Sequence, residues 1–190
     1  LKVYGVLVGR NPLIFTNNDS GYETAIEFKK NGVEPLILDT RKNPQSEIVD
    51  EAKNLGINIK FSHVVVAAQG YKKVKSADIA KISDDKEQLG AIENIKCDCI
   101  CVSGFWTPTI HLASQSGNKT KFKDDIDAFV PGASKQNETT LGAANGTYTL
   151  DETLKNSFET GYKLSKEITN KDNKISFPNV VEKKSTVHDK

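Results

Sequence analysis

The 190-residue sequence predicts an α/β fold that begins with a Rossmann-like βαβαβ unit and continues as an antiparallel meander. Two observations predict it. Short apolar runs alternate with amphipathic helical stripes over residues 13–61, as in parallel sheets with crossover helices. Three β-prone runs then follow, separated by short polar turns, which is the spacing of strands joined in a meander.

The first strand and helix are predicted from local signals. Leu13–Thr16 is a short apolar run, typical of a buried parallel strand. Ser20 and Glu23 fit a capping box, in which each side chain accepts the other residue's backbone N–H. Tyr22, Ala25 and Ile26 form a stripe at helical spacing, and Asn31-Gly32 is expected to end the helix.

The turn after the first strand predicts a nucleotide fold that has lost its ligand. Pro35–Leu38 is the expected second strand, and an acid at its tip, here Asp39, normally holds a ribose. However, Thr16–Gly21 reads TNNDSG where G-x-G-x-x-G is expected. Without those glycines the backbone cannot closely approach a pyrophosphate, and Asp19 at the helix N-terminus would repel one.

A second helix and four more strands complete the first half. Asn43 is expected to cap the helix, with Pro44 at its first position and Gly56 after its end. Its apolar stripe consists of Ile48, Val49, Ala52 and Leu55. The strands expected next are Ile57–Phe61, His63–Ala68, Lys73–Ile82 and Ala91–Ile95.

A further strand is expected over Cys97–Val102. Cys97, Cys99 and Cys101 alternate along it, so we expect all three on one face, as small buried residues of a central strand. The alternative is a metal or redox cluster. Three ligands along one strand are too close together for tetrahedral capture, and the two-residue loop of a zinc motif is absent, so no metal site is predicted.

Two later segments are candidate ligand contacts. Ser103-Gly104 ends the strand, and open α/β sheets bind ligands at the carboxyl ends of their strands. Leu141–Gly146 precedes a long helix whose start fits a capping box from Thr149 to Glu152. Gly161 interrupts the helix at a cost of about 1 kcal/mol, so a close backbone contact is expected there. The helix stripe consists of Leu150, Leu154, Phe158, Gly161, Leu164 and Ile168.

A set of motifs in fixed order resembles the alpha subunit of heterotetrameric sarcosine oxidase. They lie between about Tyr4 and Leu164, and are Phe15–Ala25, Asp39–Arg41, Val102–Leu112, Ala128–Gly132 and Gly142–Gly146. In that family a dinucleotide-binding half precedes this region and a folate-binding domain follows it, so the resemblance implies an internal piece of a larger subunit. The order of elements also resembles the inserted domain of flavoproteins of the glutathione-reductase type.

The resemblance implies domains and a site. Residues 1–96 would form a degenerate NAD(P)-binding-like domain, 97–169 the C-terminal part of a second, NAD- or FAD-type dinucleotide domain, and 170–190 a linker or tail. The second part carries Ala143-Ala144 where flavoproteins have a cofactor-touching acid, which resembles the NAD-holding alpha subunit. The cofactor-binding residues would be Ser103, Gly104, Phe105, Gly142, Ala143 and Ala144, converging on one dinucleotide.

The resemblance also implies an assembly that oxidises sarcosine to glycine. It would use FAD, FMN, tetrahydrofolate and oxygen, hold NAD in the alpha subunit, and release hydrogen peroxide with formaldehyde or methylene-tetrahydrofolate. The partners would be the other subunits and the remaining domains of the same subunit. No catalytic residue is assigned to this chain, and no cofactor is expected to be held tightly by it alone. The alternatives are a related opine, proline or glycine-to-cyanide dehydrogenase subunit, and a structural module without nucleotide.

Composition and isolated residues narrow the function classes. A net charge of +1 gives no nucleic-acid signal, no apolar run reaches membrane-spanning length, and reduced thiols suit a cytoplasmic protein. His63 and His111 are favoured as structural residues over a base or phosphate contact, and His188 as a solvated residue of the tail. Trp106 is favoured in packing over ring stacking. Asp124–Asp127 is read as an acidic helix start because it lacks the pattern of a calcium loop.

Overall fold

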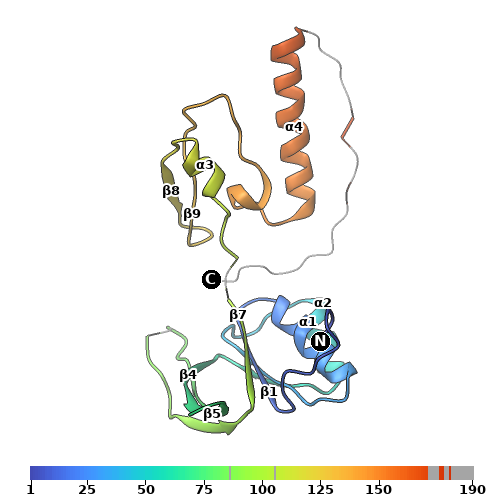
Figure 1. Ribbon diagram of the computed structural model, residues 1–190, viewed down its shortest axis with the longest axis vertical. Helices are drawn as coiled ribbons and strands as arrows, with labels where there is room; N and C mark the ends of the chain where they lie inside the picture. The colour runs from blue at the N-terminus through green and yellow to red at the C-terminus, as the bar shows by residue number, and fades with distance from the viewer. Residues whose placement is uncertain (86, 105, 171–175, 178–179, 181–190) are drawn as a thin grey trace. The chain divides into compact units, whose positions relative to one another are not determined.

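The computed structural model describes residues 1–85, 87–104, 106–170, 176–177 and 180 (Figure 1). The chain divides into two compact units. Unit 1 comprises residues 1–105 with 185–190, and unit 2 comprises residues 106–184.

Unit 1 is built on a four-stranded parallel sheet in the order β3-β2-β1-β7. The order β1-α1-β2-α2-β3 along the chain confirms the predicted βαβαβ unit. The elements are β1 (Pro12–Thr16), α1 (Ser20–Lys30), β2 (Leu36–Asp39), α2 (Glu47–Asn54), β3 (Asn58–Phe61) and β7 (Cys99–Ser103).

The predicted meander is also confirmed. Its three antiparallel strands lie in the order β4-β5-β6. They are β4 (His63–Gly70), β5 (Val74–Lys81) and β6 (Glu93–Lys96).

Two hydrophobic clusters cover the two faces of the parallel sheet. On one face Ile14 and Ile37 pack with the buried side of α1 and α2, including Tyr22. On the other face Leu13 and Leu38 pack with residues of β5 in the meander. The alternation of side chains along each strand produces this division, and it leaves both faces of the sheet covered within unit 1.

The helix starts differ from the predictions in one respect each. Helix α1 begins at Ser20 with Asp19 as its N-cap residue, so the Ser20–Glu23 capping box was wrong. The Ser20 N–H donates instead to Asn18 Oδ1 at 2.9 Å. Helix α2 begins at Glu47 rather than at Pro44. The Asn43 Oδ1 that was expected to cap it accepts instead from Gln45 Nε2 at 2.9 Å.

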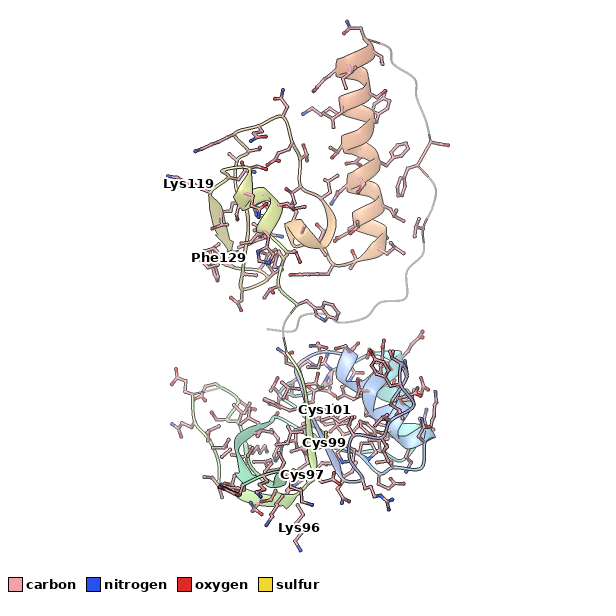
Figure 2. The ribbon with its side chains drawn as sticks, viewed as in Figure 1. Lys96, Cys97, Cys99, Cys101, Lys119 and Phe129 are labelled. Carbon is pink, nitrogen blue, oxygen red and sulfur yellow. The ribbon has the colours of Figure 1, made fainter. Side chains whose placement is uncertain are left out.

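The three cysteines follow one another along the chain at β7 (Figure 2), but they do not share one face of the sheet, so that prediction was wrong. Cys97 packs on the meander side of the sheet, whereas Cys101 packs on the helix side. The chain bends at Asp98, whose N–H donates to the Asn11 carbonyl at 3.2 Å, and the bend interrupts the alternation. Cys99 Sγ lies 3.7 Å from Cys101 Sγ.

Strand β7 is an edge strand, not a central one, in the sheet that the described residues form. It pairs with β1 and therefore belongs to unit 1. The chain is divided into compact units between residues 105 and 106. The domain boundary predicted at 96/97 stays a prediction. Among the residues that can be described, no group of three or more His, Cys, Asp or Glu side chains is placed to hold a metal ion.

In its described residues, unit 2 contains a hairpin, two short helices and one long helix. Asp124–Asp127 forms the turn of the hairpin rather than a helix start, because β8 and β9 pair on either side of it and Phe122 contacts Phe129 (ring centroids 5.2 Å apart). The elements are α3 (His111–Gln115), β8 (Thr120–Lys123), β9 (Ala128–Pro131), the 3-10 helix η1 (Gly142–Asn145) and α4 (Leu150–Thr169).

Helix α4 begins after Thr149, as predicted. The predicted capping box was wrong, because Thr149 makes no side-chain cap hydrogen bond. Its Oγ1 donates instead to Glu152 Oε2 at 3.0 Å, and the Glu152 N–H donates to Asp151 Oδ1 at 2.8 Å. The predicted tail after Thr169 falls mostly outside the described residues. In the described part of the chain, no helix is both long and apolar enough to cross a membrane.

Candidate functional site at the carboxyl edge of the parallel sheet

Three strand ends bring polar side chains to one edge of the unit 1 sheet. Thr16 ends β1 and lies in register with Asp39 at the end of β2 and with Ser103 at the end of β7. Parallel strands place their carboxyl ends on the same edge, where open α/β sheets bind ligands. The side chains at this edge therefore bear on the prediction that the first turn has lost its nucleotide ligand.

Asn18 occupies the position where a phosphate would meet the helix N-terminus. Its side chain is buried, and its Oδ1 accepts from the Ser20 N–H at 2.9 Å and from Ser20 Oγ at 2.6 Å. Free N–H groups in the first turn of a helix are what make such a turn bind anions. Here the Ser20 N–H is already used by an internal amide.

The same amide also ties the turn to the end of β7. Asn18 Nδ2 donates to the Gly104 carbonyl at 2.6 Å and to the Ser103 carbonyl at 3.4 Å. Ser103 Oγ donates to Asn18 Oδ1 at 3.2 Å and lies 2.5 Å from Ser20 Oγ. Thr16 closes the turn from the other side, because its Oγ1 donates to the Asn18 carbonyl at 2.8 Å. We call Thr16, Asn18, Ser20, Ser103 and Gly104 the edge network.

Asp39, the expected ribose ligand, is directed into the protein. Its carboxylate is fully buried and accepts from Tyr22 OH at 2.6 Å and from Arg41 Nη2 at 2.8 Å. Arg41 also pairs with Asp19, with Nη1 2.9 Å from Oδ1. The carboxylate that was expected to repel a phosphate is thus balanced by a guanidinium, and Asp39 is engaged by protein groups.

Burial shapes the protonation of this charge cluster. Desolvation, together with the neighbouring Asp39 carboxylate, raises the pKa of Tyr22 well above its ordinary value, so the phenol remains a donor. Burial by itself would lower the pKa of Arg41. Its hydrogen bonds and charge attraction to Asp39 and Asp19 outweigh that effect and raise the pKa. The guanidinium therefore stays charged between the two carboxylates.

Gly21 is the only glycine in the turn Thr16–Gly21, and it allows close packing of α1 on β1. A Cβ added there would lie 2.6 Å from the Thr16 side chain. Helix α1 thus approaches the end of β1 as closely as a nucleotide-type unit requires. The other glycines of a phosphate-binding turn are missing from Thr16–Gly21.

The six predicted cofactor-binding residues are divided between the units. Ser103 and Gly104 lie in unit 1 and belong to the edge network, whereas Gly142, Ala143 and Ala144 lie in η1 of unit 2. Phe105 falls outside the described residues. Because the two groups lie in different units, their convergence remains a prediction.

The three histidines and Trp106 were considered as candidate functional residues from the sequence. His63 Nδ1 lies 2.6 Å from the Phe61 carbonyl, as a structural histidine would. His111 is exposed at the start of α3, and His188 falls outside the described residues. Trp106 is about half exposed, and its carbonyl accepts from Tyr148 OH at 2.7 Å.

Sequence reasoning missed Asn18 and Arg41, the two residues that organise the edge. The signal for Asn18 was its place just before a helix, where asparagine side chains accept backbone N–H groups. The signal for Arg41 was weaker. It is one of only two arginines in the chain and follows Asp39 by two residues, but nothing local showed that Asp19 would complete the cluster.

Solved structures identify the class of fold. The chain superposes on thioredoxin reductase from Lactococcus lactis with a TM-score of 0.56 at 16% identity, covering 73% of this chain and 46% of that one. It superposes on bacillithiol disulfide reductase from Staphylococcus aureus with a TM-score of 0.52 at 15% identity, covering 66% and 38%. These likenesses confirm the predicted α/β dinucleotide-binding type of fold.

The sequence comparisons find relatives of one kind. No protein-family model matches the chain. It is 29% identical over 150 residues to the sarcosine oxidase alpha subunit of Corynebacterium sp. (strain P-1), covering 78% of this chain and 15% of the relative. It is 32% identical over 149 residues to the same subunit of Rhizobium meliloti (strain 1021), covering 77% and 14%. The predicted resemblance is confirmed, and the chain spans about 15% of the length of these relatives.

Proposed function

We propose that the chain is part of the alpha subunit of a sarcosine-oxidase-like oxidoreductase. The observation that carries the proposal is the match to sarcosine oxidase alpha subunits over more than three quarters of the chain. That match is longer than unit 1, so it includes residues of both units. Unit 1 would be a structural domain of nucleotide type, and unit 2 would contribute to the NAD-holding domain.

The activity proposed for the complete assembly is the oxidation of sarcosine to glycine. FAD, FMN and tetrahydrofolate would serve the assembly, NAD would bind the complete alpha subunit, and the products would include hydrogen peroxide with formaldehyde or methylene-tetrahydrofolate. The other subunits of a heterotetramer would be its partners in the cytoplasm. No residue of this chain is placed in the redox step.

One observation supports the predicted NAD contacts. Among the described residues, a Cβ added at Gly104 would have no heavy atom within 4 Å, so there is room for a ligand to approach the backbone. Gly142 has a φ of +64°, which explains why glycine stands at the start of η1. Backbone groups at Ser103-Gly104 and at Gly142–Ala144 would hold and orient NAD, whose chemistry when bound is hydride acceptance.

Gly104→Val should weaken NAD binding to the complete alpha subunit by more than tenfold, or about 1.4 kcal/mol. The valine would fill the space left for the dinucleotide, while the lack of neighbours at Gly104 should leave the fold intact. Isothermal titration with NAD measures the effect, and circular dichroism checks the fold. Unchanged NAD affinity in a folded variant would rule out the assignment, as would a complete structure that holds the two glycine segments apart.

The second candidate is a structural module that binds no nucleotide, and the edge network favours it for unit 1. NAD and NADP should show no saturable binding to the 190-residue chain with a Kd below about 10 μM, or about −7 kcal/mol. Asn18 already uses the helix N-terminus, and Asp39 is engaged by Tyr22 and Arg41. Binding tighter than this that disappears in Asn18→Trp would contradict the prediction. The same titration of the complete subunit separates the two candidates, since only the first expects NAD to bind there.

The alternative is that the chain is part of the alpha subunit of a related amine or imino-acid dehydrogenase, which would oxidise a different substrate. Opines, proline and glycine are the substrates of such assemblies. The matched relatives are named for sarcosine, which favours sarcosine. Substrate-dependent reduction of the complete assembly, compared among these four compounds, tests this part of the proposal.

A further inference from the structure

Cys99 and Cys101 form a pair of neighbouring thiols on one face of the parallel sheet. Cys101 packs on the helix side of the sheet, and the Cys99 Sγ lies 3.7 Å from the Cys101 Sγ. Both side chains are half-buried. Cys97, the third free cysteine of the chain, packs on the opposite face. The bend at Asp98 therefore leaves a dithiol that is separated from the remaining cysteine.

The segment before β1 covers Cys99. A Cβ added at Gly9 would lie 2.7 Å from the Cys99 Cβ, so the backbone at Gly9 passes directly against this side chain. Asp98 holds the segment in place, because its carboxylate accepts from the N–H groups of Arg10 and Asn11 at 2.8 Å each. This contact limits the positions open to the Cys99 side chain and keeps its sulfur beside the second thiol.

Cys101 lines a cavity that gives a small reagent access to the pair. The cavity has a volume of about 360 Å³, and Val8, Glu23 and Phe28 also contribute to its wall. Val8 and Glu23 are exposed, so the cavity opens to solvent. A water molecule occupies about 30 Å³ in the liquid, and hydrogen peroxide is only slightly larger. The cavity therefore admits such an oxidant to the Cys101 side of the pair.

A disulfide needs no group beyond these two thiols, whereas a metal ion does. Zinc in a structural site takes four ligands, and among the described residues no third His, Cys, Asp or Glu side chain completes a metal site. Cα atoms two residues apart in a strand are separated by about 6.6 Å, which lies within the range of about 4.4–6.8 Å found for disulfides. In the described sheet β7 pairs only with β1, so closure would disturb a single pairing.

We propose that Cys99 and Cys101 are a peroxide-oxidised site that closes to a reversible intramolecular disulfide. The Cys99 thiolate attacks one oxygen of hydrogen peroxide, the O–O bond breaks, and a sulfenic acid forms while the released hydroxide takes up a proton to become water. The Cys101 sulfur then attacks the Cys99 sulfur and forms the S–S bond. The sulfenic hydroxyl leaves with the Cys101 proton as a second water. Two thiols and one peroxide thus give one disulfide and two waters.

The surroundings of the two thiols favour this order of attack. Burial, together with the neighbouring Cys99 sulfur, raises the pKa of the Cys101 thiol to about 12, so Cys101 stays protonated at neutral pH and Cys99 is the attacking group. The Cα spacing is near the upper limit for a disulfide, and strained disulfides are readily reduced. Hydrogen peroxide is a product of the proposed function, so the source of the oxidant rests on that function.

Thiol titration of the 190-residue chain is the primary test. The reduced chain has three free thiols, and one should remain after treatment with hydrogen peroxide. Cleavage before Asp98 by endoproteinase Asp-N separates Cys97 from the pair. The fragment with Cys99 and Cys101 should be two hydrogen atoms lighter, and glutathione should restore both thiols. Unchanged thiols, sulfinic or sulfonic acids in this fragment, or a disulfide that glutathione does not reduce would overturn the proposal.

Cys97→Ala is the matched control, because it removes the cysteine outside the pair and should still lose two thiols. Cys101→Ser should instead stop at the Cys99 sulfenic acid, which dimedone should trap at least tenfold more than in the unsubstituted chain. Circular dichroism checks the fold of both variants. A disulfide between Cys97 and Cys99 in the unsubstituted chain, or loss of the disulfide in Cys97→Ala, would contradict the assignment without any need for the Cys101 variant.

A bound metal ion is the competing occupant of the site. One equivalent of zinc that stays with the purified chain, and protects both thiols from peroxide until a chelator removes it, would overturn the proposal. Failure of the proposed function is distinguishable. If the complete assembly does not oxidise sarcosine, but added peroxide still joins Cys99 to Cys101, the disulfide site is supported and only the source of the oxidant is rejected.

Discussion

Replacing Arg41 with methionine should lower the free energy of unfolding of unit 1 by about 3–5 kcal/mol, the usual cost of removing one partner from a buried ion pair. The guanidinium is the cation between Asp19 and Asp39, and all three side chains are nearly inaccessible to solvent. Its removal leaves two carboxylates in a desolvated site. Urea unfolding followed by circular dichroism measures the loss, and hydrogen exchange of α1 amides assigns it to unit 1.

Lys42→Met is the matched control. Lys42 follows Arg41 directly and also pairs with an aspartate, Asp84, at 2.8 Å, but both side chains of that pair are mostly exposed. Exposed pairs contribute about 0–1 kcal/mol, so the control should change stability little. Replacing Asp19 and Asp39 with asparagine in the Arg41→Met background should recover part of the loss. If Arg41→Met and Lys42→Met lower the free energy of unfolding equally, the buried charge cluster contributes no more to stability than an exposed ion pair.

Replacing Asn18 with alanine should lower the free energy of unfolding by about 2–3 kcal/mol. The change leaves the Ser20 N–H and the Gly104 carbonyl without their partner. An orphaned buried group costs about 1–3 kcal/mol, and a lost N-terminal cap typically about 1 kcal/mol. The edge network should loosen at the end of β7 as well as at the start of α1, and exchange of amides in both segments detects this.

Asn17→Ala is the control for the edge network. Asn17 precedes Asn18 and accepts one hydrogen bond from its Nδ2, at 3.0 Å, but it is only half-buried. We expect a loss of less than about 1 kcal/mol. Asn18→Asp should be more harmful than Asn17→Ala, because a carboxylate cannot donate to the Gly104 and Ser103 carbonyls. If Asn18→Ala is as mild as the control, water or neighbouring groups replace the amide.

Elements with strong periodicity could be predicted from sequence, and their ends could not. The stripe of Val49 and Ala52 predicted α2, but its start depended on whether Asn43 would meet the backbone or the Gln45 side chain. The alternation of cysteines predicted a strand, but a bend at Asp98 sends Cys97 to the opposite face of the sheet. At Asn43 a neighbouring side chain took the expected cap. At Asp98 the chain bends where it bonds to Asn11, which is 87 residues away. The sequence pattern carried no information about either contact.

The candidate site also has a part that local sequence predicted and a part that it did not. The missing glycines between Thr16 and Gly21 indicated an altered phosphate turn, because close backbone approach needs residues without a Cβ. What replaced the ligand depended on contacts between distant segments. Asn18 and Gly104 are 86 residues apart, and Asp19 and Arg41 are 22 apart.

By itself, the sequence determined the α/β class, the βαβαβ-meander order and the loss of a glycine cradle, because periodicity, turn residues and backbone freedom are local properties. Only the tertiary structure decided that β7 joins the first sheet as an edge strand, that Asn18 uses the helix N-terminus, and that Arg41 balances Asp19 and Asp39. These outcomes depend on which strand ends meet at one sheet edge and on how much solvent is excluded there. Both conditions arise only when the chain has folded.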